Sequence, residues 1–548
     1  MYIDISHIKR NNKTYKRVLL RNSYRVAGKV KHDTIANLSS CSESEIDAIK
    51  LALKHKDNLN NLGNLKDNIN TKQGLGVGAV WVLDKLAERV GLKKALGNTQ
   101  QGKLALWLVM ARIIEQGSRL SATRLAQRHH VCDILKLKSF DENDLYDAMD
   151  FLASNQNDIE KALFDFRYGK EKPNFYLYDV TSSYFEGEQN ELANYGYNRD
   201  KKLGKTQIVI GLMTDDEGRP IAIEVFEGNT QDPKTVANQI QKLADRFQVT
   251  EVTLVGDRGM LKQAQIKDLE ARDFHYITAI TKPQIETLIK NEVVQLSLFD
   301  DKIVEVVNDN IRYILHRNPV RADELEISRQ SKLSHLRKMI DKSNRYLAEH
   351  PRSKLETQLR NIHAKASRLK IDKWVNIQFI DGNITLESNE KKKKKASQLD
   401  GCYVIKTDLS QEVAEAAKIH SRYKDLAHVE RAFRTMKTVL LEMRAVYVRK
   451  EDRTRAHVFV VMLAYLLAHQ LQQAWREVEL TVEEGIAELA SICSLELQLP
   501  GQTIWQTIPE PNSIGKTLLS KLNISLPKAI PYRNATVTTT KKLIPERI

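Results

Sequence analysis

Five apolar segments between residues 174 and 281 decide the fold of this chain: FYLYDV (175–180), TQIVIGLM (206–213), IAIEVF (221–226), VTLVGD (252–257) and FHYITAI (274–280). Each is short, rich in β-branched or aromatic residues and bounded by polar residues, which is typical of strands. Asp232-Pro233 supplies an N-cap and a first-turn proline for a helix to about Phe247, and a second helix is expected over 261–271. The order strand, strand, strand, helix, strand, helix, strand predicts an α/β core.

Different patterns flank this core on both sides. Before it, residues 15–38 alternate like short strands, 55–73 form a polar linker, and 78–165 have apolar residues at helical spacings. After it, a helical stretch over about 322–370 is broken at His350-Pro351, which predicts a hairpin of helices. Short strands (374–380, 384–387, 402–407), a run of five lysines (391–395), a helical segment (411–445) and a very apolar helix (454–475) follow.

The positive charge of the chain is concentrated in two segments. The net charge is +15, yet residues 1–40 hold nine basic and two acidic side chains and residues 311–370 hold fifteen and six. The other 448 residues are therefore close to neutral. Two basic patches on an otherwise ordinary protein indicate contact with a polyanion and exclude a uniformly basic, histone-like coat.

Several classes of protein are excluded by what the sequence lacks. The longest apolar run, residues 458–468, has eleven residues, whereas a membrane-spanning helix needs about twenty. The N-terminus has no apolar signal-peptide core. The four cysteines are scattered without a CxxC pair, and no GxxxxGK[ST] loop is present. We therefore expect an intracellular protein without a membrane, zinc or nucleotide site.

Two acids stand at the ends of apolar segments. Asp179 and Asp257 each end an expected strand, where a carboxylate reaches solvent from a fixed backbone. On neighbouring strands they could share divalent ions, because Mg²⁺ prefers oxygen ligands and two such ions serve phosphoryl transfer. Alternatively, each aspartate simply ends a strand or caps a turn.

A third acid lies on an expected helix, SRYKDLAHVERAFRTMKT (421–438). Tyr423, Glu430 and Lys437 recur every seven residues, which places them on one face, and Arg434 lies nearby. An acid flanked by these groups suits a metal ligand beside DNA phosphates. The alternative is an amphipathic surface helix with ordinary ion pairs.

A second chemistry is also suggested by residues of this region. His428, Arg431, His457 and Tyr465 loosely resemble the set of a tyrosine recombinase, which attacks DNA without a metal. Tyr465, however, sits in the apolar run VFVVMLAYLLA and is better interpreted as a core residue.

Four motifs together resemble bacterial insertion-sequence transposases of the DDE type: YDVTSSYFEG (178–187), YGYNRDKKLGKTQIVIGLMTDDEGRPIAIEVFEGNTQD (195–232), VGDRGM (255–260) and YKDLAHVERAFRTMKT (423–438). Within that family the chain is most similar to the insertion-sequence-four group, whose third acid lies in a Tyr-x2-Arg-x3-Glu-x6-Lys signature. Tyr423, Glu430 and Lys437 match this signature, whereas Leu426 stands where the signature has Arg. Lys424, Arg431 or Arg434 could take the place of that Arg.

The resemblance implies a ribonuclease-H-like core interrupted by a mixed α/β insertion. It also implies Asp179, Asp257 and Glu430 as catalytic residues and ligands of two Mg²⁺ ions, with Mn²⁺ as a substitute. Trp374, in the insertion, could stack on a flipped base as in some relatives, although a core role is the better interpretation. DNA contacts are expected from Tyr423 and from these basic side chains: Arg434, Lys437, Arg337, Lys338, Lys342 and Arg345.

The sequence thus predicts a transposase that binds terminal inverted repeats as a homodimer, cuts the ends and joins them to target DNA, near the nucleoid in the bacterial cytoplasm. A metal-dependent nuclease without joining activity and a non-catalytic DNA-binding protein are the alternatives. The expected organisation is a basic β-rich segment (1–60), a helical DNA-end-binding domain (75–165), the two core parts (170–283 and 411–480), the insertion with its basic hairpin (284–410) and a C-terminal region (481–548).

Overall fold

A computed structural model of the chain describes residues 1–10, 13–57, 70–187, 189–299, 303–437, 440–443, 446–498, 505–531 and 535–539. At the N-terminus, β1 (Tyr2–Arg10), β2 (Lys13–Val26) and β3 (Lys29–Asn37) form an antiparallel sheet, followed by α1 (Glu43–Lys54). Ala27 and Gly28 both have positive φ, as a two-residue hairpin turn requires, and Ser42 caps α1 in a capping box with Glu45. The basic β-rich segment predicted from the sequence has this form.

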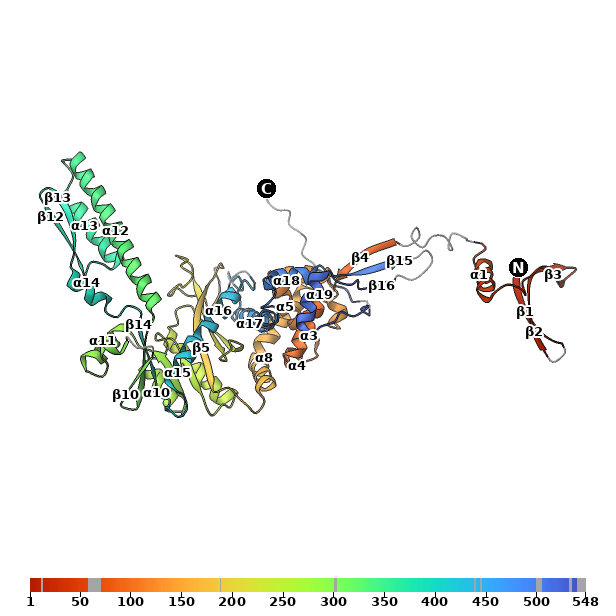
Figure 1. The fold of residues 1–548 in the computed structure, drawn as a ribbon, viewed down its shortest axis with the longest axis horizontal. Coiled ribbons are helices and arrows are strands. Elements are labelled where there is room, and N and C mark those ends of the chain that lie inside the picture. Colours follow the sequence, from red (N-terminus) through yellow and green to blue (C-terminus); the bar gives the residue numbers. More distant parts are fainter. Residues whose placement is uncertain are drawn as a thin grey trace.

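An eight-stranded mixed sheet forms the centre of the fold (Figure 1). Its strand order is β10-β11-β14-β9-β8-β5-β6-β7; β5, β6 and β7 run antiparallel, and β8 and β9 run parallel to β5. The five strands predicted between 174 and 281 are all present. The strands are β5 (Phe175–Tyr184), β6 (Gln207–Thr214), β7 (Pro220–Glu227), β8 (Thr253–Gly256), β9 (His275–Ala279), β10 (Val304–Asn308), β11 (Ile311–Arg317) and β14 (Cys402–Thr407).

Both faces of this sheet are buried. Tyr176 and Tyr178 pack on one face with residues of α9 and α10, while Leu177 and Ile210 pack on the other with α16 and α17. Packing is close: a Cβ on Gly211 would lie 2.2 Å from the Tyr178 hydroxyl, so only glycine fits there. The covering elements are α9 (Asp232–Gln241), the π-helix η2 (Lys242–Arg246), α10 (Gln263–Glu270), α11 (Lys282–Lys290), η3 (Leu296–Phe299), α15 (Ala416–Lys424), α16 (Leu426–Lys437) and α17 (Glu451–Ala474).

The segment predicted as an insertion, 284–410, is divided by the structure. Its strands β10, β11 and β14 continue the central sheet, because β14 hydrogen-bonds to β9. A separate hydrophobic core joins α12 (Pro319–Glu349), α13 (Leu355–Leu369), β12 (Val375–Ile380) and β13 (Asn383–Ser388). Trp374 is 4% exposed within that core, which favours its core interpretation over base stacking. The five lysines lie in a short helix, α14 (Glu390–Ser397).

A helical assembly adjoins the β7 side of the sheet (Figure 1). The central helix α17 packs against α5, α8 and β7, and is buried along most of its length, as its apolar sequence predicted. The C-terminal part of the chain completes this assembly, since α18 packs on α3 and β15 pairs with β4. Its other elements are α3 (Gly78–Arg89), α4 (Leu92–Leu96), α5 (Gln100–Ile114), α6 (Arg119–Gln127), α7 (Val131–Ile134), α8 (Glu142–Tyr168), α18 (Val482–Ala490), α19 (Ser513–Leu522), β4 (Asn70–Gly76), β15 (Cys493–Gln498) and β16 (Trp505–Thr507).

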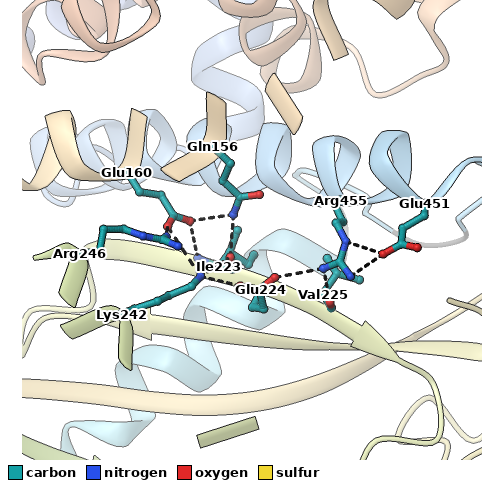
Figure 2. A network of polar contacts seen from close by, with 9 residues as sticks. All are labelled: Gln156, Glu160, Ile223, Glu224, Val225, Lys242, Arg246, Glu451 and Arg455. Atoms are coloured by element: carbon teal, nitrogen blue, oxygen red, sulfur yellow. Dashed lines mark hydrogen bonds and ion pairs between the residues drawn. The ribbon is translucent and has the colours of Figure 1, made fainter. Parts of the chain in front are cut away.

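Side chains of the helical assembly occupy the outer edge of the sheet, strand β7 (Figure 2). The Ile223 amide donates to Glu160 (3.1 Å), and the Ile223 carbonyl accepts from Gln156 (2.8 Å). Arg455 of α17 donates to the Val225 carbonyl at 2.6 Å. These contacts satisfy backbone groups that an edge strand would otherwise leave open to another strand, and they join the sheet to α8 and α17. No helix among the described residues is long and apolar enough to cross a membrane.

Candidate active site

Strand register brings the first two acids together. Strands β5 and β8 are parallel, and Tyr178 pairs with Gly256, so the next residues, Asp179 and Asp257, lie on adjacent strands at the same level. Asp257 follows the last residue of β8, as predicted. The prediction that Asp179 also ends its strand is wrong, because β5 continues to Tyr184 through its pairing with β6.

The third acid comes from a helix that crosses β5. Helix α16 packs its buried side chains, Val429, Ala432, Phe433 and Met436, inward and leaves Glu430 exposed. The predicted single helix over 421–438 is interrupted at Asp425, whose carbonyl accepts from the His428 amide at 2.8 Å in a tight turn. Tyr423 therefore stands on α15, and Glu430 and Lys437 stand on α16.

One cavity of about 780 Å³ receives all three acids. Asp179, Asp257 and Glu430 line it from β5, from the end of β8 and from α16. Tyr423 and Leu426, two positions of the predicted signature, line the same cavity. Segments separated by more than 70 and 170 residues in the sequence thus converge on one solvent-filled space.

The acids of this cavity repel one another. Burial raises the pKa of the Asp179 carboxyl to about 7, although the Val180 amide, which donates to it at 2.8 Å, opposes the shift. The negative charges of Asp257 and Glu430 raise this pKa further. Burial also raises the pKa of the Tyr423 hydroxyl, and the charge of Asp257 adds to that rise. An external cation would relieve this concentration of negative charge.

Lys424 and three basic side chains that the sequence analysis did not single out surround the acids; these three are Arg199, Arg258 and Lys282. Arg199 forms an ion pair with Asp232 at 2.5 Å, and burial lowers the pKa of Lys282. Arg199 and Arg258 lie inside the quoted motifs, so their positions in these motifs could have identified them as residues of the cavity. Lys282 follows β9, and only the fold reveals that this strand ends at the same cavity.

The predicted basic contacts lie in three different surroundings. The Lys437 ammonium is directed inward and donates to Thr181 Oγ1 (3.0 Å), the Ser182 carbonyl (2.6 Å) and Asp200 (2.7 Å). Arg434 lies outside the acid cavity and lines a second hollow beside Trp475. Four side chains are exposed on α12, away from the cavity lining: Arg337, Lys338, Lys342 and Arg345.

Two residues of the alternative recombinase set are buried. Tyr465 is 2% exposed, and its hydroxyl donates to the Gly218 carbonyl at 3.3 Å. His457 is also buried, in contact with the Met443 carbonyl. Both side chains therefore belong to the core around α17.

The donor atoms of the three acids decide which metal ion the cavity suits. Within the described residues, no three His, Cys, Asp or Glu side chains are grouped tightly enough to form a ready-made metal cluster. The three acids nevertheless offer only carboxylate oxygens, which hard divalent cations prefer, and the charges of Asp257 and Glu430 act on Asp179 within the cavity. The chemistry of the residues present therefore fits a divalent ion.

Two family models match parts of this chain. The family model of the transposase DDE domain matches residues 170–467, more than half of the chain, and the model of the IS1634 family transposase N-terminal domain matches residues 3–68. No curated protein matches significantly. A cryo-EM structure of a piggyBac transposase synaptic complex with hairpin DNA has 8% sequence identity and a TM-score of 0.34, covering 75% of this chain and 76% of that chain.

Proposed function

The chain belongs to the family of transposases with a DDE domain, and from this premise we propose that it binds the terminal inverted repeats of an insertion sequence, cuts its ends and joins the 3′ ends to target DNA. One observation carries the proposal: three acids from distant segments line a single cavity that basic side chains surround. Tyr423, Glu430 and Lys437 further support a place in the insertion-sequence-four group, while the N-terminal match names the IS1634 family.

We assign the core a ribonuclease-H-like fold. The order of its first five strands in the sheet, β7-β6-β5-β8-β9, with the first three antiparallel, supports this assignment. The core would comprise 170–283 and 411–480, the insertion 284–410, the N-terminal segment 1–60, the helical end-binding domain 75–165 and the C-terminal region 481–548. The finding that β10, β11 and β14 extend the core sheet narrows the free-standing part of the insertion to α12–α14 with β12 and β13.

Asp179, Asp257 and Glu430 would hold two Mg²⁺ ions, with Mn²⁺ as a substitute. Such ions, when bound, activate an attacking oxygen and stabilise the leaving oxygen. In the cutting step, a water oxygen forms a bond to phosphorus and the bond to the 3′ oxygen of the element breaks. In the joining step, that 3′ oxygen attacks a target phosphate and releases a target 3′-hydroxyl.

The chain's own basic residues would bind the DNA. Arg258, Lys282 and Lys424 at the cavity attract the phosphate that reacts, and the exposed basic side chains of α12 and of the N-terminal sheet attract the flanking duplex. Because two ends must be brought together, we propose a homodimer that acts on nucleoid DNA in the bacterial cytoplasm. The predicted contacts of Tyr423, Arg434 and Lys437 with DNA remain predictions.

The test uses purified full-length protein and DNA that carries the element's own terminal repeat. With Mg²⁺, the wild-type protein is expected to nick the end and to join it to a target plasmid, and Asp179→Asn is expected to shift the end DNA normally in a gel but to leave it intact. Nicking without joining would indicate a nuclease instead. Nicking that survives in Asp179→Asn would refute the assignment of the site.

A further inference from the structure

Three large apolar side chains are exposed to solvent in one loop, whose Arg199 lines the acid cavity. In the loop between β5 and β6, Tyr195 is 72% exposed, Tyr197 is 83% exposed and Leu203 is 98% exposed. They are the most exposed large apolar side chains among the residues that the structure describes. Such exposure is unfavourable in an isolated protein, so a partner that covers these side chains is expected.

The backbone that carries the two tyrosines is held in place. Gln207 donates to the carbonyls of Tyr197 (3.2 Å) and Gly228 (2.8 Å). A Cβ on Gly196, between the tyrosines, would lie 2.1 Å from the Gly228 carbonyl oxygen, so the loop and β7's end are in close contact. The rings are therefore presented by a fixed support, which lowers the entropy cost of binding to them.

The same loop is anchored to the elements that carry the acids. The Arg199 amide donates to Ser182 Oγ on β5 at 3.0 Å, and Asp200 accepts from Lys437 of α16 at 2.7 Å. The Arg199 guanidinium lines the acid cavity and lies 5.8 Å from the centre of the Tyr197 ring. Tyr197 therefore lies next to a residue that lines the acid cavity.

The loop carries an excess of basic residues, of which Arg199 pairs with Asp232 and Lys205 pairs with Glu186. Between 195 and 206 there are four basic residues, Arg199, Lys201, Lys202 and Lys205, and one acid, Asp200, for a net charge of +3. Exposed aromatic rings interleaved with cations are the pattern that binds single-stranded nucleic acid, because each base stacks on a ring while cations contact the backbone. Bases within a duplex already stack on each other, so such rings need unpaired nucleotides.

From this arrangement we infer that Tyr195 and Tyr197 form a stacking platform for unpaired nucleotides of the DNA strand that enters the acid cavity. The inference rests on the proposed function and adds a ligand class, unpaired bases, and a site, the β5–β6 loop. Leu203, Lys201 and Lys202 are exposed in the same loop.

The experiment compares two DNA ends in EDTA, where no cutting occurs. One is a blunt duplex of the terminal repeat, and the other carries three unpaired nucleotides at the end, including 2-aminopurine, whose fluorescence falls when it stacks. Binding is followed by anisotropy and by 2-aminopurine fluorescence with the full-length protein. The variants are Tyr195→Ala/Tyr197→Ala, the ring-retaining Tyr195→Phe/Tyr197→Phe, and Phe166→Ala, an exposed aromatic residue of α8 outside the loop.

The alanine pair is expected to lose fluorescence quenching and to bind the unpaired end about tenfold more weakly, since stacking contributes this much or more per base. Affinity for the blunt duplex should change by less than about twofold, because phosphate contacts are kept. The phenylalanine pair and Phe166→Ala should resemble the wild type, and equal melting temperatures would verify folding.

Three outcomes would overturn the inference: unchanged binding of the unpaired end, an equal loss on both DNA ends, or loss of quenching in the phenylalanine pair. The inference would also be overturned if the alanine pair sedimented with a lower mass than the wild type but kept its fluorescence quenching, because the tyrosines would then contact a second copy of the chain. Failure here leaves Mg²⁺-dependent nicking by the wild type intact, whereas failure of the proposed function abolishes that nicking.

Discussion

Two groups of carboxylates in this protein, one at the junction of sheet and helices and one in the acid cavity, have opposite electrostatic surroundings. At the junction of sheet and helices, Glu160 is fully buried, lies 2.5 Å from Arg246 and 3.8 Å from Lys242, and accepts from the Ile223 amide. Figure 2 shows these partners converging on it. In the acid cavity, Asp179 accepts from the Val180 amide and faces the charges of two further acids.

The difference separates a carboxylate that the chain neutralises with its own cations from the carboxylates that we propose as metal ligands. Two cations of the chain itself, Arg246 and Lys242, neutralise the charge of Glu160. In the cavity, burial raises the pKa of Asp179, and the charges of Asp257 and Glu430 raise it further. A folded chain retains such an arrangement at a cost in stability, and this cost is typical of functional sites.

The largest effect should distinguish the two groups by chemistry. Asp257→Asn and Glu430→Gln should each lower the rate of end nicking by at least about a thousandfold, because each removes an oxygen donor from the proposed metal site. Glu224→Gln, in the junction network, should stay within about tenfold of the wild type. Single-turnover nicking with end DNA measures these rates. Comparable losses of nicking rate in all three variants would show that the cavity acids are no more important for the reaction than the junction acids.

The next effect should distinguish them by stability. Glu160→Gln leaves Arg246 and Lys242 without their shared buried acid and should lower the free energy of unfolding by about 3–5 kcal/mol. Glu451→Gln, at the more exposed end of the same network, should cost no more than about 1 kcal/mol. Urea denaturation gives both values; equal losses would mean that burial does not set the strength of the network.

A smaller effect should appear in the pH dependence of stability. The pKa of Asp179 is about 7 in the folded protein against an ordinary value of 3.8, so the folded state binds its proton more tightly. In EDTA, wild-type stability should therefore fall as pH rises from about 4 to about 7, and Asp179→Asn should lack this fall and gain about 1–3 kcal/mol over the wild type above pH 7. Parallel curves for the two proteins, measured by urea denaturation at each pH, would contradict the shift.

The smallest effect on stability is expected for exposed charges of α12, which belong neither to the junction network nor to the acid cavity. Replacing Arg337, Lys338, Lys342 and Arg345 together by Gln should change the free energy of unfolding by no more than about 0.5 kcal/mol per site. The same variant should flatten the slope of log K against log salt for end DNA by up to about 3 to 4, since each lost phosphate contact contributes about 0.9. An unchanged slope would mean that this patch of α12 does not contact DNA.

The sequence alone indicated much of the core, because local patterns carry that information. Five strands with their helices, the buried α17 and the three acids followed from periodicity and from quoted motifs. Pairings between distant segments did not follow, since β14 joins β9 across more than 120 residues and no local pattern encodes such a partner. For the same reason the inward direction of Lys437 and the position of Lys282 at the cavity required the fold.

The parallel pairing of β5 with β8 has a consequence for how this chain tolerates change. Tyr178 opposes Gly256, and this single alignment, rather than the length of chain between the strands, places Asp179 beside Asp257. Loops between them can therefore lengthen or shorten without disturbing the two aspartates. A slip of one residue between the strands would instead turn one aspartate to the opposite face of the sheet. Insertions should thus be accepted in the loops but rejected within either strand, because the register of the sheet fixes the positions of the two aspartates.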